Sequence, residues 1–272
     1  MSYYSVFGLE KEPFSTSPDP QFFYHSPDHH AALKRLEIAI RLRRGLSLIL
    51  GDVGTGKTTL SRMLLGAFKG EDNFIFHMIL DPGYRSEFQF LSSLVKMFGL
   101  SPEFKSTLDF KEALERYLFQ KGVEENKTIV LLIDEGQKIT PENLEVLRML
   151  LNYETNEFKL LQLVIMAQVE FLPRVKRVRN FMDRVALKYT INPLDEAETK
   201  ELIQFRVRQA GYGGEGSLFT DGAVRFIHEY TQGYPRKVAM LCHDCLEAAV
   251  MKESPLVDVD IVNSLIAHEV QV

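Results

Sequence analysis

The sequence predicts an α/β protein in which a mostly parallel sheet is followed by a helical C-terminal region, and three observations predict it. Between residues 46 and 191, short apolar runs alternate with stretches of helical periodicity, as in sheets that helices cover on both faces. A glycine-rich loop joins the first of these runs to a helical pattern. From residue 192 onward the periodicity is helical only, which marks the end of the sheet.

Composition fits a globular protein and limits its function. The chain has 272 residues, of which 45% are hydrophobic and 25% charged, so it can bury a sizeable core in one large domain or two smaller ones. Its formal net charge is -5, which disfavours general coating of nucleic acid, because such binding needs many cationic contacts to phosphate. No apolar run is long enough to span a bilayer, and the first residues do not form a secretory signal. We therefore expect a cytoplasmic protein without an integral membrane segment.

The elements follow from local patterns. Residues 1–25 are rich in proline and aromatic residues, which resist regular helix yet carry too much apolar surface for a free tail, so we expect an ordered N-terminal arm. Ser26 and Pro27 suit the cap and first position of a helix that runs to Arg43. The apolar runs predict strands, and the periodic stretches between them predict helices. The expected strands cover 46–50, 74–80, 129–133, 160–167 and 185–191, and the expected helices start at Lys57, cover 86–98 and 109–120, and follow Pro141.

These patterns predict three parts. They are the N-terminal arm at 1–25, an α/β core at 26–191, and an all-helical domain at 192–272 that is interrupted by a glycine-rich loop near residue 213 and by a turn at Gly233 and Pro235. Cys242 and Cys245 are too few for a disulfide framework and have the spacing of half a zinc site. Because no second cysteine pair exists, we interpret them as buried core thiols.

Residues 51–58 read Gly-Asp-Val-Gly-Thr-Gly-Lys-Thr, which satisfies the pattern of a phosphate-binding loop between a strand and a helix. Glycines let backbone N–H groups wrap a phosphate chain, and the following helix adds its positive end. Lys57 supplies a charge to the β and γ phosphates, and Thr58 offers a hydroxyl to Mg²⁺. The sequence thus predicts a site for ATP and Mg²⁺ formed by Gly51, Asp52, Val53, Gly54, Thr55, Gly56, Lys57, Thr58 and Thr59.

A second chemical element follows the apolar run 129–133, which ends in the adjacent acids Asp134 and Glu135. Acids at the carboxyl end of a parallel strand lie where open α/β sheets bind ligands. Asp134 would hold the magnesium ion through its water shell, and Glu135 would orient and deprotonate an attacking water. Together with the phosphate-binding loop, this pair predicts hydrolysis of a nucleotide.

The acidic pair, the strand arrangement and the helical tail resemble the AAA+ ATPases of the P-loop NTPase class. The sequence is most similar to the GspA/ExeA-type ATPases associated with bacterial type II secretion, which are related to TnsC-like ATPases, and the similarity covers nearly the whole chain. The matching residues are Tyr4–Leu9, Pro13-Phe14, Pro18-Asp19-Pro20, Gly51–Thr59, Asp134-Glu135 with Gln137, Leu150-Leu151-Asn152, Glu154-Thr155, Leu160-Leu161-Gln162 and Gly233-Tyr234-Pro235-Arg236.

The resemblance assigns roles to further residues. It implies that Gln168 is a polar sensor that helps place the attacking water, and that Arg236 is a lid arginine that reaches the γ phosphate. It also implies that Arg184 is an arginine finger given to a neighbouring subunit, with Arg179 as a competing candidate. The sequence departs from the family in two places, because Ala167-Gln168-Val169 replaces Gly-Gln-Pro and Gly136 replaces a common alanine.

The resemblance implies an AAA+ ATPase with a C-terminal helical lid that forms a ring or filament and drives assembly or remodelling in a secretion or cell-envelope system. A protein partner would then recruit it to the inner membrane.

Longer members of that family continue into a membrane helix and a periplasmic module that this sequence lacks, which favours two alternatives. One is an ATP-dependent regulator that binds duplex DNA like the TnsC-type transposition ATPases, through a basic stretch from Arg174 to Lys188. The other is a nucleotide switch with little turnover.

Overall fold

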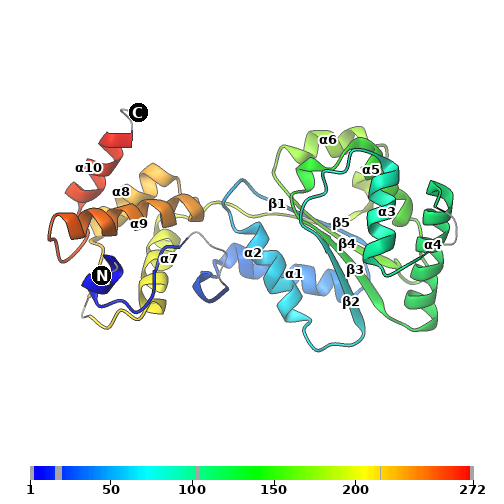
Figure 1. Ribbon diagram of the computed structural model, residues 1–272, viewed down its shortest axis with the longest axis horizontal. Helices are drawn as coiled ribbons and strands as arrows, with labels where there is room; N and C mark the ends of the chain where they lie inside the picture. The colour runs from blue at the N-terminus through cyan, green and yellow to red at the C-terminus, as the bar shows by residue number, and fades with distance from the viewer. Residues whose placement is uncertain (1–2, 16–19, 102–104, 215, 270–272) are drawn as a thin grey trace. The chain divides into compact units, whose positions relative to one another are not determined.

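The computed structural model describes residues 3–15, 20–101, 105–214 and 216–269. Pro18 and Asp19 of the family resemblance lie outside them. The described residues form two compact units (Figure 1). The sheet unit comprises residues 29–52 and 60–191, and the helical unit comprises the described residues up to 28, residues 53–59, and those from 192 onward.

The sheet unit is built on five parallel strands, which confirms the predicted fold class. Their order across the sheet is β2-β3-β4-β1-β5. Leu50 pairs with Ala167, and Ile133 pairs with Ile165, so the ends of β1, β3 and β4 share one edge of the sheet. The strands are β1 Leu46–Leu50, β2 Phe74–Ile79, β3 Thr128–Ile133, β4 Leu161–Ala167 and β5 Val185–Thr190.

Helices cover both faces of this sheet (Figure 1). Because successive side chains of a strand point to opposite faces, β3 contributes to two separate cores. Ile129, Leu131 and Ile133 pack with α3, α4, α5 and α6, whereas Val130 and Leu132 pack with α1 and α2. These helices are α1 Pro27–Arg41, α2 Lys57–Ala67, α3 Glu87–Met97, α4 Thr107–Phe119, α5 Pro141–Leu150 and α6 Phe171–Arg177.

Short elements that the sequence did not predict complete this unit. α6 is a seven-residue helix, too short to give a clear periodicity. A five-residue π-helical turn, η3 Gln120–Glu124, extends α4, and single turns form at η4 Gly136–Lys138 and η5 Met182–Arg184. Both η4 and α6 lie next to residues that the sequence singles out for chemistry.

The helical unit has its own core. α7 Glu196–Gln209, α8 Asp221–Thr231, α9 Pro235–Met251 and α10 Val259–Glu269 pack their apolar faces together. Cys242 and Cys245 are buried in this core, and burial raises the pKa of the Cys245 thiol to about 12. Thiolate ligands for a metal are therefore disfavoured here. None of the helices in the described ranges has both the length and the apolarity that a membrane span requires.

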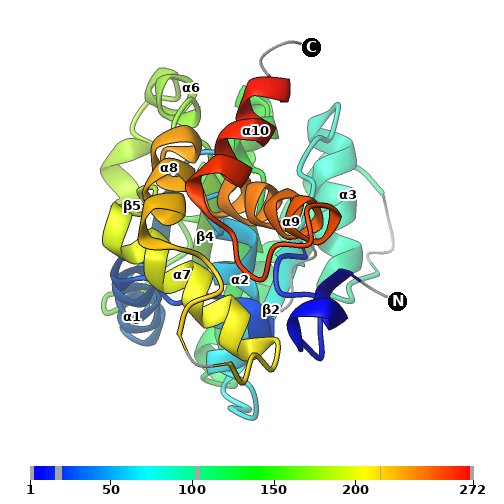
Figure 2. The ribbon, with the colours of Figure 1, turned by 90° about the vertical axis from the view of Figure 1, so that its left-hand side faces the viewer.

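The N-terminal arm packs against the helices of the helical unit, as Figure 2 shows for the segment beside α9. Two single turns, η1 Tyr3–Phe7 and η2 Pro20–Phe22, contact α9 and α7. Leu9, Phe14 and Phe22 are buried among the helices, and the Tyr3 hydroxyl lies 2.8 Å from Nδ1 of His243. The arm is thus part of the helical core, and its aromatic residues supply apolar surface that four short helices would otherwise lack.

Candidate functional site

The phosphate-binding loop leaves the sheet at the end of β1. The N–H of Gly51 donates to the carbonyl of Ala167 at 3.2 Å, which ties the start of the loop to β4. Gly54 and Gly56 adopt φ values of +84° and +94°, a region that residues with a Cβ rarely enter. The glycines of the motif therefore occupy positions where the backbone itself requires them.

The loop ends where α2 begins, at Lys57. Lys57 and Thr58 are thus the first two residues of a helix, and the N–H groups and positive dipole end of a helix N-terminus favour an anion. Thr55 and Lys57 are both buried. Asp52, within the motif, and Leu60, in the first turn of α2, belong to the sheet unit.

The acidic pair follows β3 at the same edge. Asp134 is buried, and its N–H donates to the carbonyl of Ile79 at 2.8 Å. Its carboxylate oxygen Oδ1 accepts the N–H of Glu135 at 2.9 Å. Glu135 has a φ of +53°, an uncommon conformation for a residue other than glycine, and such strain gathers at functional sites. Its side chain is half-buried.

Gln137 joins Glu135 to the end of β4. Its Nε2 donates to Oε2 of Glu135 at 2.7 Å, and its Oε1 accepts the backbone N–H of Gln168 at 3.1 Å. The sequence singled out Glu135 and Gln168 for catalysis but assigned Gln137 no role. The available signal was a polar amide two positions after the acidic pair, and an amide that both donates and accepts suits a bridging position.

Gly136 makes the close packing of this segment possible. A Cβ at this position would lie 2.5 Å from Cγ2 of Ile165 and 3.1 Å from Cβ of Ala167. The backbone of η4 therefore lies directly against β4, which explains locally why glycine replaces the alanine expected from the family resemblance. An alanine here would require the η4 turn or Ile165 to shift.

Within the helical unit, the first turn of α9 reaches the phosphate-binding loop. The N–H of Arg236 donates to the carbonyl of Gly54 at 3.3 Å. A Cβ on Gly54 would lie only 2.9 Å from Cβ of Arg236, so the glycine also permits this close approach. Arg236 thus lies beside the loop, and its contact with the γ phosphate stays a prediction.

Gly233 fixes the position at which α9 begins. Its carbonyl accepts the N–H of Leu194 at 2.9 Å, its φ is +70°, and a Cβ would lie 1.9 Å from the carbonyl oxygen of Leu194. No side chain fits at this distance, so the start of α9 is fixed against the segment that precedes α7.

Replacing Gly233 by alanine should therefore lower the free energy of unfolding by about 3 kcal/mol, because the backbone must shift to relieve the overlap. Gly8 is a matched control, since its φ is also +70° but no atom lies within 4 Å of the position that a Cβ would take. Gly8→Ala should cost only about 1 kcal/mol. Denaturant unfolding of both variants checks the difference, and equal losses would show that the overlap has no energetic consequence.

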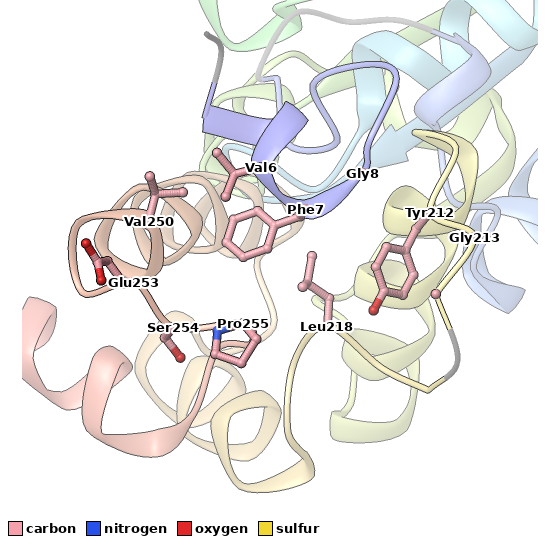
Figure 3. A pocket seen from close by; sticks show the side chains of 11 residues that line it. Val6, Phe7, Gly8, Tyr212, Gly213, Leu218, Val250, Glu253, Ser254 and Pro255 are labelled. Carbon is pink, nitrogen blue, oxygen red and sulfur yellow. The ribbon is translucent and has the colours of Figure 1, made fainter.

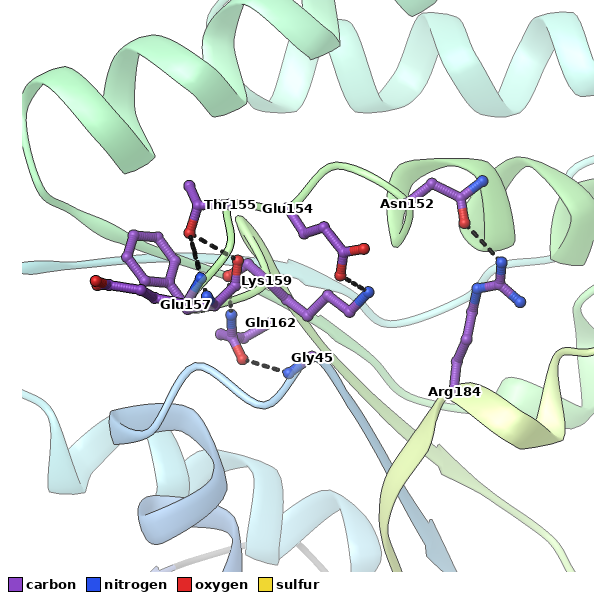
Figure 4. A network of polar contacts seen from close by, with 9 residues as sticks. Gly45, Asn152, Glu154, Thr155, Glu157, Lys159, Gln162 and Arg184 are labelled. Atoms are coloured by element: carbon purple, nitrogen blue, oxygen red, sulfur yellow. Dashed lines mark hydrogen bonds and ion pairs between the residues drawn. The ribbon is translucent and has the colours of Figure 1, made fainter.

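The two finger candidates differ in their contacts. Arg184 donates to Oδ1 of Asn152 at 2.6 Å (Figure 4). It also donates to the carbonyl of Asn180 at 2.7 Å. Arg179 is exposed and makes no hydrogen bond or ion pair within the described part of the chain. The side chain of an arginine finger extends from its own subunit to the nucleotide of a neighbouring subunit. Arg184 would first have to break both of these hydrogen bonds, whereas Arg179 has none to break among the described residues.

The basic stretch runs over α6 and into β5. Its cationic side chains are exposed apart from Arg184, which is half-buried, and Arg174 contacts the η4 turn through hydrogen bonds to the carbonyls of Gln137 and Ile139. The stretch consists of Arg174, Lys176, Arg177, Arg179, Arg184 and Lys188.

A cavity of about 650 Å³ opens elsewhere in the helical unit (Figure 3). Its wall is mainly apolar and comes from η1, the glycine-rich loop, the C-terminal end of α9 and the segment after it. None of the residues expected to bind nucleotide lines it, so this cavity is separate from the predicted chemistry. Its lining residues are Val6, Phe7, Gly8, Tyr212, Gly213, Gly214, Leu218, Val250, Glu253, Ser254 and Pro255.

Comparison with protein families gives a match to the AAA domain over residues 40–175. This range contains the phosphate-binding loop, the acidic pair and Gln168. The chain belongs to the AAA family of P-loop ATPases. The AAA domain thus includes every strand of the sheet except β5.

Two curated relatives match this AAA protein. The general secretion pathway protein A of Aeromonas hydrophila is 34% identical over 271 residues, which are 98% of this chain and 48% of the relative. An uncharacterised HTH-type transcriptional regulator of Methanocaldococcus jannaschii is 26% identical over 157 residues, which are 56% of this chain and 38% of that protein. The chain thus spans about half, or less, of the length of these relatives.

Solved structures share the AAA fold at low sequence identity. Drosophila ORC bound to DNA has a TM-score of 0.69 and 20% identity over 99% of this chain and 66% of that one. Cdc6p from Pyrobaculum aerophilum has a TM-score of 0.67 and 18% identity over 90% and 67% of the two chains. The Thermotoga maritima RuvB Holliday junction branch migration motor has a TM-score of 0.58 and 16% identity over 90% and 72%.

Proposed function

We propose that this AAA protein hydrolyses ATP with Mg²⁺ and uses the energy for assembly or remodelling in a secretion or cell-envelope system. One observation supports the hydrolysis most strongly: the phosphate-binding loop and the acidic pair follow β1 and β3 at the same edge of the sheet. The secretion context is supported by the 34% identity to general secretion pathway protein A over nearly the whole chain.

In this mechanism each residue acts on a separate part of the reaction. Lys57 donates to the β and γ phosphates, and the start of α2 adds backbone donors. Glu135 accepts a proton from the attacking water, which Gln168 helps to place. Arg236 stabilises the negative charge that develops on the γ phosphate. An arginine from a neighbouring subunit, Arg184 or Arg179, would complete the site in a ring or filament.

The residues at the loop and after β3 fit a magnesium ion. Mg²⁺ prefers oxygen ligands, often one or two carboxylates together with phosphates and water. Asp134 offers a buried carboxylate, and Thr58 offers a hydroxyl in the first turn of α2. We propose that these two residues hold the ion. When bound, it would neutralise phosphate charge.

A second function is an ATP-dependent regulator that binds duplex DNA. The exposed cations of the basic stretch favour it, because phosphate contacts of this kind dominate DNA affinity. One solved structure with this fold is described as ORC bound to DNA.

In the secretion role, by contrast, the protein would work in the cytoplasm and a protein partner would recruit it to the inner membrane.

One experiment tests these functions together. Phosphate release from ATP should require Mg²⁺, stop on addition of EDTA, and rise per chain with protein concentration if a neighbour supplies a finger. Binding to non-specific duplex DNA is then measured with a slowly hydrolysed ATP analogue at low and physiological salt. If DNA binding requires the nucleotide and persists at physiological salt, the protein is a DNA-binding regulator and the proposed secretion function is wrong. Absence of ATP turnover would overturn the ATPase proposal.

A further inference from the structure

We propose that Gln137 is a positioning residue for Glu135, and that Arg174 links this residue to the exposed basic stretch. The inference rests on the proposed ATPase function and deepens it, because it names a control point of that site. Its residues belong to the sheet unit, and a chain of hydrogen bonds connects them from α6 to Glu135.

The orientation of the Gln137 amide follows from its partners. A backbone N–H can only donate, so the group that faces Gln168 at 3.1 Å must be the carbonyl oxygen of the Gln137 side chain. The NH₂ group is then directed to the Glu135 carboxylate at 2.7 Å. A carboxylate accepts and an amide NH₂ donates, so both ends of Gln137 are satisfied in one arrangement.

The backbone keeps Gln137 in this place. The η4 turn closes through hydrogen bonds from Lys138 to Glu135 at 2.8 Å and from Ile139 to Gly136 at 3.0 Å. Gly136 packs directly against β4, where even a Cβ would lie 2.5 Å from Ile165. Glu135 itself is half-buried and held at a positive φ. A donor on its carboxylate therefore selects one side-chain rotamer from the few that this backbone allows.

Arg174 connects this arrangement to the protein surface. Its guanidinium donates to the carbonyl of Gln137, and to the carbonyl of Ile139 at 3.2 Å. These two carbonyls lie within and just after the η4 turn, while the Arg174 residue is exposed on α6. An anionic partner that binds the basic stretch would compete for this guanidinium. Its release would loosen the turn that carries Gln137, so a binding event on α6 would change the position of Glu135.

The first test removes the polar atoms of Gln137 at nearly constant volume. Gln137→Met should lower kcat for ATP about tenfold, since a misplaced base loses its alignment with water, while affinity for ATP stays unchanged. Gln162 is the matched control, because its buried amide also bridges two backbone groups, Gly45 N at 2.8 Å and Lys159 O at 2.7 Å (Figure 4). Gln162→Met should lower the free energy of unfolding and leave kcat unchanged below its unfolding transition.

A double-mutant cycle separates positioning from simple structural damage. In a Glu135→Gln background, Gln137→Met should have no further effect on kcat, because the group that it positions is already gone. If the fold-loss of kcat in the double variant equalled the product of the two single losses, Gln137 would not act through Glu135. An unchanged kcat in Gln137→Met would likewise overturn the role of Gln137. A wild-type chain without ATP turnover would overturn the proposed function, and this inference would fall with it.

The link to the basic stretch has its own test. Arg174→Gln should lower kcat several-fold with ATP affinity unchanged, whereas Lys96→Gln, which removes an exposed charge from α3, outside the basic stretch, should not. A short polyanionic duplex added to the wild type should change kcat, and the same addition to Arg174→Gln should have a smaller effect. Equal behaviour of the two variants would overturn the role of Arg174.

Discussion

Glu135→Gln is expected to bind ATP with the affinity of the wild type and to hydrolyse it about 100- to 10,000-fold more slowly, the range that general-base catalysis contributes. Glutamine keeps the size of the side chain and an oxygen that can accept a hydrogen bond from the Gln137 NH₂ group, but it cannot take a proton from water. The substitution therefore removes one chemical capability and leaves the rest of the site in place. Steady-state phosphate release and equilibrium binding of ATP check both halves of this expectation.

The control for this variant is Glu145→Gln. It makes the same chemical change on α5, where Glu145 is exposed and forms an ion pair with Arg148 at 2.6 Å. Because exposed pairs contribute little to stability, about 0–1 kcal/mol, both kcat and affinity should stay at the wild-type values. Turnover by Glu135→Gln at the wild-type rate would show that another group accepts the proton.

Lys57→Met should have the opposite profile, with a large loss of ATP affinity. Lys57 is buried at the start of α2, where an ammonium group would face the phosphates beside the N-terminal N–H groups of the helix. Removing a charge-assisted hydrogen bond costs about 2 kcal/mol or more, which is about a thirtyfold rise in Kd for ATP. Calorimetric titration of the variant with ATP and Mg²⁺ measures this change.

Lys69→Met provides the comparison, because Lys69 is exposed in the turn just after α2. It removes the same charge from the neighbourhood of the same helix and should leave ATP affinity unchanged. If Lys57→Met kept the wild-type Kd, the phosphate-binding loop would not be the nucleotide site. The two variants together separate binding from chemistry, since Lys57→Met should lose affinity and Glu135→Gln only turnover.

The sequence alone could predict the features that depend on neighbouring residues. Alternating apolar runs and helical periodicity located the five strands and the longer helices of the sheet unit within a few residues of their observed bounds. The glycines at 54 and 56 could be assigned to a phosphate-binding loop because their positive φ is a local requirement. Asp134 and Glu135 could be assigned to the end of a buried strand because a continuous apolar run precedes them.

Contacts between distant segments were decided only by the tertiary structure. Nothing local to Gln137 indicates that β4 supplies a backbone N–H to its amide, or that Arg174 from α6 holds the same turn. The packing of the N-terminal arm on the helical unit and the approach of Arg236 to Gly54 are likewise absent from the local pattern. Periodicity reports which face of an element is buried, whereas the partner of that face depends on how the strands are ordered in the sheet and on how the helices pack in space.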